Sequence, residues 1–335
     1  MNSLQLSFNS LNPKKKNSIE YPGISPKGYK NKLWICKNED NFPLILIQSS
    51  VEFNFLGGQK YSNIELLHHQ KKIIQDEQHS EEVLCSSILC KTEDDELNTL
   101  FFESLLPLLK KIKFPADPKE LNFLLERLVK LFKSLGGTPK KTTQGLWAEL
   151  FLIYQSENKK ELLECWHEEA NDLYDFRKGI FSIEVKSTLG VERKHIFSLE
   201  QAYPREYSVL IASFKLERDE AGLSIKTLIE DIQKDVSEDQ DLIEKLNYIV
   251  WSTLGNTWSS SIKESFNEEL AKKELEFYDI KDIPKLEESS LRIKGLSKIS
   301  FTSNLESKSP IRRSTYKGKS RLYKEAIGYV RNTNL

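Results

Sequence analysis

The stretch from residue 173 to 188, LYDFRKGIFSIEVKST, carries the residues best suited to chemistry. It reads as a short extended run ending at Asp175, a glycine-containing turn, and a strand over residues 180–187. Successive side chains of a strand point to opposite faces, which puts Glu184 and Lys186 on one face. The turn brings Asp175 back beside Glu184. This hairpin therefore predicts two carboxylates and one ammonium group in a small space.

Such a group of side chains suits a hard divalent cation. Mg²⁺ takes an octahedron of oxygen ligands and keeps several waters, so Asp175, Glu184 and the backbone carbonyl of Val185 are the predicted protein ligands. A metal-bound water loses its proton more easily than bulk water, and Lys186 is the candidate to orient it or accept that proton. Mn²⁺ is the expected substitute for Mg²⁺. The alternative is that E-x-K marks only the solvated face of a half-buried strand, since the chain is rich in lysine and glutamate.

A further carboxylate stands in an apolar segment upstream. Residues 145–154, GLWAELFLIY, predict a helix that Thr142 or Thr143 can cap, and Glu149 is its only charged residue. A carboxylate buried in such a run is costly unless it is paired or bound to a metal. An arginine partner, or a narrow exposed strip on the helix, is the alternative. With the downstream hairpin present, a role in the metal site is favoured.

Apolar periodicity indicates the elements that position these residues. A helix over 118–135 has Asp117 as its N-cap and a glycine pair at its end. Two further amphipathic helices are expected at 224–236 and 239–251, and a strand at 293–303. Nearer the N-terminus, short runs predict strands of a β-rich module at 33–37, 43–48 and 86–91.

Composition excludes several classes of protein. Lysine plus arginine (49) balances aspartate plus glutamate (50), so a nucleic-acid-binding surface has to be local. The four cysteines form no CxxC pair and have no histidine at zinc-ligand spacing. No run approaches the roughly 18 uncharged apolar residues of a membrane helix, and the N-terminus lacks a signal-peptide core. We therefore expect a cytoplasmic protein without membrane contact.

A basic stretch near the C-terminus offers contacts for a polyanion. Its cations are interleaved with tyrosines able to stack on bases, among them Tyr316 and Tyr323. The predicted nucleic-acid-binding residues are Arg312, Arg313, Lys317, Lys319, Arg321 and Lys324. The alternative is a solvated tail.

Taken in order, these features resemble the PD-(D/E)XK nuclease superfamily, over about residues 145–230. More narrowly, GLWAELFLI, Trp166, DLYDF, IEVKST, HIFSLEQ and YSVLIASFKL are similar to an uncharacterised PD-(D/E)XK family encoded in bacterial restriction and anti-phage defence gene clusters. One departure is that the proline of the family name is absent, because Tyr174 precedes Asp175.

The resemblance implies a role for each matching position. Glu149 would be the helix carboxylate near the metal, Asp175 and Glu184 the metal ligands, and Lys186 the catalytic lysine. Gln201 would be a supporting polar residue of the active site. Gln201 also has a structural alternative, because Ser198 three residues earlier predicts a capping box.

The resemblance also implies a fold. We expect an α/β (α+β) protein with a restriction-endonuclease-like core, in which helices flank a mixed central sheet. The expected segments are a β-rich N-terminal accessory region at 1–93, a helical linker and nuclease core at 94–255, and a helical C-terminal extension with the basic tail at 256–335. The length of 335 residues suits more than one domain.

The implied function is a metal-dependent endodeoxyribonuclease acting as the restriction-type effector of a bacterial defence system. Its implied partners are DNA and a methyltransferase or ATPase subunit of the same cluster. A homodimer would supply the two active sites that a double-strand break needs. The alternatives are a catalytically silent, DNA-binding or scaffolding subunit with a nuclease fold, and a structural protein whose function lies in the β-rich first third.

Overall fold

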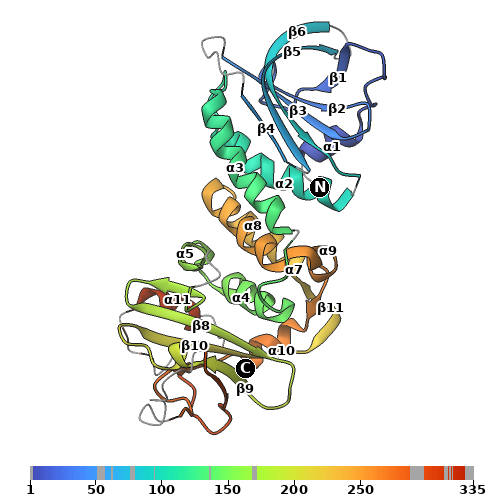
Figure 1. Cartoon of the computed structure of the whole chain (residues 1–335). Helices are drawn as coiled ribbons and strands as arrows, with labels where there is room; N and C mark the ends of the chain where they lie inside the picture. Colours follow the sequence, from blue (N-terminus) through green and yellow to red (C-terminus); the bar gives the residue numbers. More distant parts are fainter. Residues whose placement is uncertain are drawn as a thin grey trace. The chain divides into compact units, whose positions relative to one another are not determined.

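A computed structural model describes residues 3–50, 57–61, 63–75, 80–93, 95–135, 137–167, 172–286, 298–312, 316, 318 and 320–328. The chain forms two compact units, residues 1–136 and 137–335 (Figure 1). Helices α2 (Asp95–Lys111) and α3 (Pro118–Leu135) fall within the first unit. The segment boundaries expected after residues 93 and 255 stay predictions.

The first unit is built on a curled six-stranded sheet. Its strand order is β1-β2-β3-β6-β5-β4, and β1 also pairs with β5, so the sheet closes on itself. The strands are β1 (Glu20–Ile24), β2 (Leu33–Lys37), β3 (Pro43–Gln48), β4 (Gly58–Lys60), β5 (Ile64–Gln75) and β6 (Ser80–Cys90). The strands expected at 33–37 and 43–48 are confirmed, and the run at 86–91 is the end of the longer β6. The β-rich character of this region is therefore confirmed.

The helices of the first unit are α1 (Ser3–Asn9), α2 and α3. The predicted N-cap of α3 is confirmed, because Asp117 Oδ1 accepts the backbone N–H of Lys119 at 2.8 Å. Phe8 of α1 is buried and packs against Phe102 of α2, with ring centroids 5.3 Å apart. The N-terminal segment is thereby joined to the helical layer of this unit.

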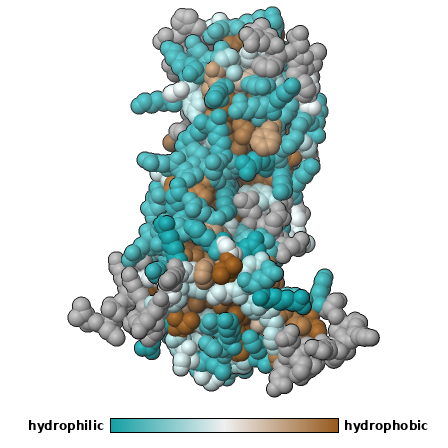
Figure 2. Space-filling view, turned by 90° about the vertical axis from the view of Figure 1, so that its left-hand side faces the viewer, coloured by the Kyte–Doolittle hydropathy of each residue, from teal (hydrophilic) through white to brown (hydrophobic). Residues whose placement is uncertain are grey.

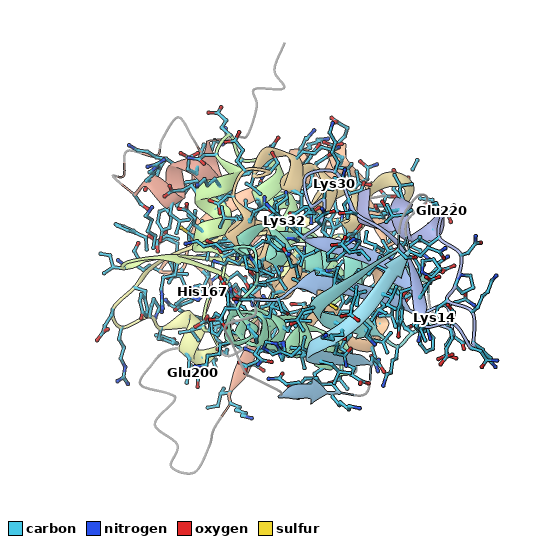
Figure 3. The ribbon with its side chains drawn as sticks, turned by 90° about the horizontal axis from the view of Figure 1, so that it is seen from above. Lys14, Lys30, Lys32, His167, Glu200 and Glu220 are labelled. Atoms are coloured by element: carbon cyan, nitrogen blue, oxygen red, sulfur yellow. The ribbon has the colours of Figure 1, made fainter. Side chains whose placement is uncertain are left out.

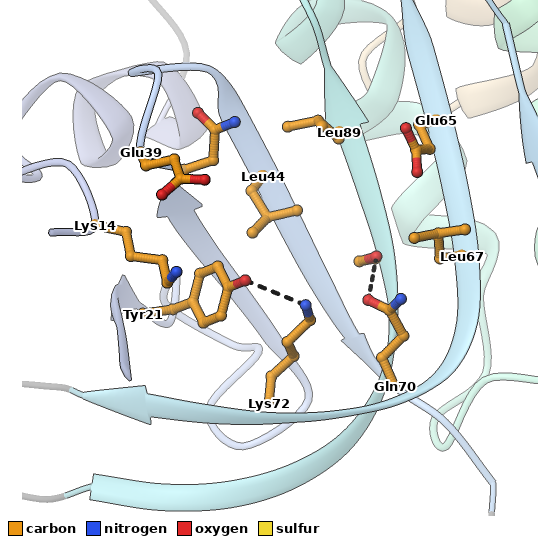
Figure 4. A pocket seen from close by; sticks show the side chains of 11 residues that line it. Lys14, Tyr21, Glu39, Leu44, Glu65, Leu67, Gln70, Lys72 and Leu89 are labelled. Carbon is orange, nitrogen blue, oxygen red and sulfur yellow. Dashed lines mark hydrogen bonds between the residues drawn. The ribbon is translucent and has the colours of Figure 1, made fainter. Parts of the chain in front are cut away.

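A pocket of about 160 Å³ opens on the curled sheet (Figure 4). The hydroxyl of Tyr21 accepts a hydrogen bond from Lys72 at 3.2 Å, and the Ser87 hydroxyl donates to Gln70 Oε1 at 3.1 Å. Both bonds join residues of the lining to one another. Several polar groups of this pocket are thus satisfied within it.

The second unit contains a mixed four-stranded sheet of order β13-β10-β8-β7. Its strands are β7 (Phe176–Lys178), β8 (Phe181–Thr188), β10 (Ser208–Lys215) and β13 (Glu276–Asp279). Strand β8 runs parallel to β10, and the other two pairings are antiparallel. The predicted hairpin is β7–β8, with Phe176 opposite Ile183 and Gly179 at a φ of 62° in the turn. This mixed sheet is the one that the sequence led us to expect.

Helices cover the sheet of the second unit. Helix α4 (Thr143–Gln155) packs against β8, and α5 (Lys159–Cys165), α7 (Ile225–Asp235) and α8 (Gln240–Leu254) pack against α4. Thr142 is the N-cap of α4, where its side chain accepts the N–H of Gly145. The ring of Trp147 stacks on Phe151, with centroids 4.6 Å apart. The helices expected at 224–236 and 239–251 are α7 and α8.

Smaller elements complete the second unit. Strand β9 (Lys194–Ser198) pairs with β14 (Ser300–Asn304), and β11 (Arg218–Ser224) pairs with β12 (Ser265–Phe266). The strand expected at 293–303 thus begins at Ser300, and residues 293–297 lie outside the described part. The remaining elements are α6 (Leu199–Ala202), η1 (Gly255–Thr257), α9 (Trp258–Ser261), α10 (Glu268–Lys273) and α11 (Arg321–Ile327).

On the face drawn in Figure 2, hydrophilic residues predominate and apolar ones form small separate patches. Within the ranges that the structure describes, no helix has both the length and the apolar character needed to cross a bilayer.

Candidate metal centre and active site

Asp175 lies directly before strand β7, where the hairpin brings it back to β8. The register that sets Phe176 opposite Ile183 places Asp175 next to Glu184 when it is continued by one residue. The Oδ2 atom of Asp175 accepts the backbone N–H of Val185 at 2.8 Å. The hairpin therefore fixes this carboxylate against the central strand, as the sequence predicts.

Glu184 is in the middle of β8 and is only 4% exposed. The alternative of a solvated strand face is therefore wrong, because β8 has a neighbouring strand on each side and helix α4 packed against it. The Oε1 atom of Glu184 accepts hydrogen bonds from Gln201 Nε2 and forms an ion pair with Lys186 Nζ, each at 2.7 Å. A buried carboxylate with these partners is held in one orientation.

Lys186 contacts the site through its ion pair with Glu184. Its Nζ lies 5.2 Å from the centroid of the Phe197 ring and 3.4 Å from Gln201 Oε1. Its side chain is 19% exposed. The ammonium group thus lies on an aromatic face, beside its ion-pair partner Glu184.

Gln201 forms the predicted capping box and also makes a hydrogen bond to Glu184. The capping box is complete, because Ser198 Oγ accepts the Gln201 N–H and Gln201 Oε1 accepts the Ser198 N–H. The same side chain donates from Nε2 to Glu184 Oε1 and to the Leu173 carbonyl. The cap therefore positions the amide that holds Glu184.

Glu149 is 3% exposed in helix α4, so the predicted burial of its carboxylate is confirmed. Its Oε2 accepts the indole N–H of Trp166 at 2.8 Å, and its Oε1 accepts a hydrogen bond from Lys141 Nζ at 2.6 Å. The charged partner is a lysine and not the arginine that the alternative named. The Lys141 ammonium also lies 2.5 Å from Asp175 Oδ1, so a single cation joins both carboxylates.

These side chains surround one cavity of about 220 Å³ within the second unit. Its lining includes Glu149, Asp175, Glu184, Gln201 and Lys141, but not Lys186. Over the described ranges, no three His, Cys, Asp or Glu side chains are arranged to hold a metal ion as they stand. The donor set nevertheless fits a hard cation, because carboxylate oxygens from two elements already share the charged Lys141 nitrogen. The Lys141 ammonium group occupies a position between these carboxylates that a metal ion could take.

Four residues of the site were missed at the level of sequence. Lys141 and Trp166 bind Glu149. His167 and Asp172 line the same cavity and are joined by a hydrogen bond between His167 Nδ1 and Asp172 Oδ2 (Figure 3 labels His167). Trp166 was noted only as part of the family resemblance. One feature of the sequence could have pointed to Lys141: it directly precedes the N-cap of the helix that carries Glu149.

Burial sets the electrostatics of the site. Burial, together with the nearby charge of Asp175, raises the pKa of Glu184 to about 8 and that of Glu149 to about 7, although the neighbouring lysines lower both. A metal ion would therefore meet carboxylates that hold protons near neutral pH. Higher pH should favour metal binding.

These raised pKa values predict how the metal-free protein responds to pH. The folded state keeps protons that the unfolded chain has released, so stability is present at low pH and is lost as pH rises through the folded pKa. Between pH 6.5 and 8.0 the free energy of unfolding should fall by about 1 kcal/mol or more in the wild type, and by less in Glu184→Gln. Urea unfolding in EDTA, followed by tryptophan fluorescence, measures this. Equal pH dependence in both proteins would contradict the assignment.

The indole of Trp166 should contribute to stability through Glu149. In Trp166→Phe the ring that stacks near Phe176 is kept, but Glu149 Oε2 loses its donor, which should cost about 1–3 kcal/mol of unfolding free energy. Circular dichroism during urea unfolding checks this. Trp251→Phe is the matched control, because the Trp251 indole nitrogen is buried and has no hydrogen-bond partner among the described residues. Equal losses in both variants would argue against the bond to Glu149.

Part of the basic tail lies on helix α11. Arg321 and Lys324 are exposed on α11, Arg312 is exposed before it, and Arg321 pairs with Glu161 at 3.3 Å. Tyr323 is 5% exposed and packs edge-on against Phe181, so the expectation that it can stack on bases is wrong. The other three predicted binding residues lie outside the described residues: Arg313, Lys317 and Lys319.

The mixed sheet, the helix carboxylate and the D…E-x-K hairpin together define a fold of the PD-(D/E)XK nuclease class. Residues 4–306 match the profile of a family described as "Putative PD-(D/E)XK family member, (DUF4420)", and the chain belongs to this family. No curated protein and no solved structure matches the chain.

Proposed function

We propose that this protein is a metal-dependent endonuclease that hydrolyses phosphodiester bonds of DNA. The observation that carries the proposal is the gathering of Glu149, Asp175 and Glu184 around one cavity, with Lys186 bound to Glu184. Two of these carboxylates already share a cation. Family membership supports the same chemistry.

Asp175, Glu184 and the Val185 carbonyl would hold Mg²⁺, for which Mn²⁺ can substitute, and Glu149 lines the same cavity. When bound, the ion supplies positive charge that stabilises the phosphoryl oxygens and promotes deprotonation of water. Lys186, which is paired with Glu184, would direct its Nζ hydrogens to the attacking water and to the charge that develops on phosphate. Gln201 keeps Glu184 aimed at the cavity through its Nε2 hydrogen bond.

The biological setting is proposed on the family relationship. A restriction-type effector of bacterial defence would work in the cytoplasm, beside a methyltransferase or an ATPase subunit of the same gene cluster. The exposed cations Arg312, Arg321 and Lys324 would contact DNA phosphates. A homodimer would bring together two active sites for a double-strand break.

Incubating the purified chain with plasmid and linear DNA in Mg²⁺, Mn²⁺ or EDTA tests the proposed activity. Internal cleavage that needs the metal is the expected result. DNA binding without cleavage under any of these conditions would favour a catalytically silent subunit instead.

A further inference from the structure

A lysine ammonium lies where two carboxylates of the proposed metal centre meet. Lys141 Nζ is 2.6 Å from Glu149 Oε1 and 2.5 Å from Asp175 Oδ1. These carboxylates come from helix α4 and from the start of the β7–β8 hairpin, so one cation ties two elements together. Hydrogen bonds between charged groups at these distances are among the strongest in proteins.

Lys141 approaches the carboxylates from the solvent side. Its side chain is 40% exposed, whereas those of Glu149 and Asp175 are 4% and 11% exposed. It precedes the N-cap Thr142, and its neighbour Lys140 is anchored by a backbone hydrogen bond to Thr253. Rotation about the side-chain bonds of Lys141 can therefore withdraw the ammonium without disturbing the helix.

Lys186 is placed differently, although it also pairs with a carboxylate of the site. It is half as exposed as Lys141, rests on the Phe197 ring, and is close to Gln201 as well as Glu184. The Lys186 side chain is therefore more enclosed than that of Lys141. Of these two lysines, Lys141 is the one placed to leave.

We propose that Lys141 is the resident counter-ion of the metal-free site and is exchanged for the divalent cation. This inference rests on the proposed function, since it assumes that Asp175 binds the metal. The ammonium offsets the repulsion between two buried carboxylates while no metal is bound. Because it holds the Asp175 oxygen that the metal would use, it competes with metal binding and sets the metal concentration at which the site fills.

A permanent structural ion pair predicts the opposite behaviour. If Lys141 stayed in place with metal bound, its removal would leave the carboxylates less well positioned and metal affinity would fall or stay the same. If Lys141 is exchanged, its removal should raise metal affinity, although the metal-free protein becomes less stable. Added metal should then restore most of that stability.

Calorimetric titration of the full chain with Mn²⁺ alone, at fixed pH, distinguishes exchange of Lys141 from a permanent ion pair. Lys141→Met should bind Mn²⁺ about tenfold more tightly than the wild type, or more, which corresponds to one charge-assisted hydrogen bond that no longer has to break. Lys160→Met, which removes an ion-paired lysine on helix α5 outside the lining of the cavity, should bind like the wild type. Lys141→Gln is the second uncharged variant in case methionine impairs folding, and Lys141→Arg should give no increase.

Unchanged or weaker Mn²⁺ binding by both uncharged variants would overturn the exchange proposal and leave the nuclease assignment standing. Failure of the nuclease assignment would give a different set of Mn²⁺ binding results. In that case Mn²⁺ would bind to neither the wild type nor the Lys141 variants, or would bind Asp175→Asn as tightly as the wild type.

Discussion

Replacing Asp175 by asparagine should reduce the rate of metal-dependent DNA cleavage by more than about 100-fold, the upper loss seen when only an outer partner of a metal ligand is removed. Asparagine keeps the size of the side chain, and its amide oxygen can still accept the Val185 N–H. The negative charge that would bind the metal is lost. Cleavage under single-turnover conditions, at saturating Mg²⁺ and again in Mn²⁺, measures the effect.

Asp279→Asn is the matched control for this substitution. Asp279 ends strand β13 of the same sheet, and its Oδ1 accepts the backbone N–H of Lys281. The control should cleave like the wild type. If Asp175→Asn and Asp279→Asn retained the same rate, Asp175 would not be a ligand of the catalytic metal.

Lys186→Met should lower the cleavage rate by about 10²- to 10⁴-fold, the usual contribution of a positioned group that transfers or holds a proton. Methionine preserves most of the packing on Phe197 but removes the charge beside Glu184. Mn²⁺ affinity should not fall, because a competing cation near the ligand is gone. Parallel single-turnover and calorimetric measurements separate loss of chemistry from loss of metal.

Lys215→Met is the control for the lysine. Lys215 ends strand β10 and pairs with Glu306 at 2.7 Å, so the substitution also removes an ion-paired lysine from the sheet. Its cleavage rate should match that of the wild type. Wild-type cleavage by Lys186→Met would remove this lysine from the mechanism.

The hairpin and the helix carboxylate were predictable because short-range rules determine them. Alternation along β8 and the turn at Gly179 suffice to bring Asp175 beside Glu184. The burial of Glu149 follows from an apolar helix that is covered on nearly every side. The strand pattern alone, however, could not tell a solvated face from a buried one. That distinction depends on β10 and α4, which arrive from elsewhere in the chain.

Long-range pairing explains what the sequence did not reveal. The closure of the first sheet through β1 and β5 joins residues about 50 positions apart, and no local pattern encodes it. The place of Lys141 between Glu149 and Asp175 depends equally on the meeting of α4 with the hairpin. Tyr323 was misassigned because a tyrosine in a basic stretch looks available for stacking until α11 packs it against Phe181.

Anomalous diffraction from crystals soaked in Mn²⁺ tests the central claim most directly, because it locates the metal independently of activity. The account predicts a Mn²⁺ peak bound by the carboxylates of Asp175 and Glu184, in the cavity that Glu149 also lines. Mn²⁺ bound elsewhere, with no peak at these two carboxylates at saturating metal, would contradict it.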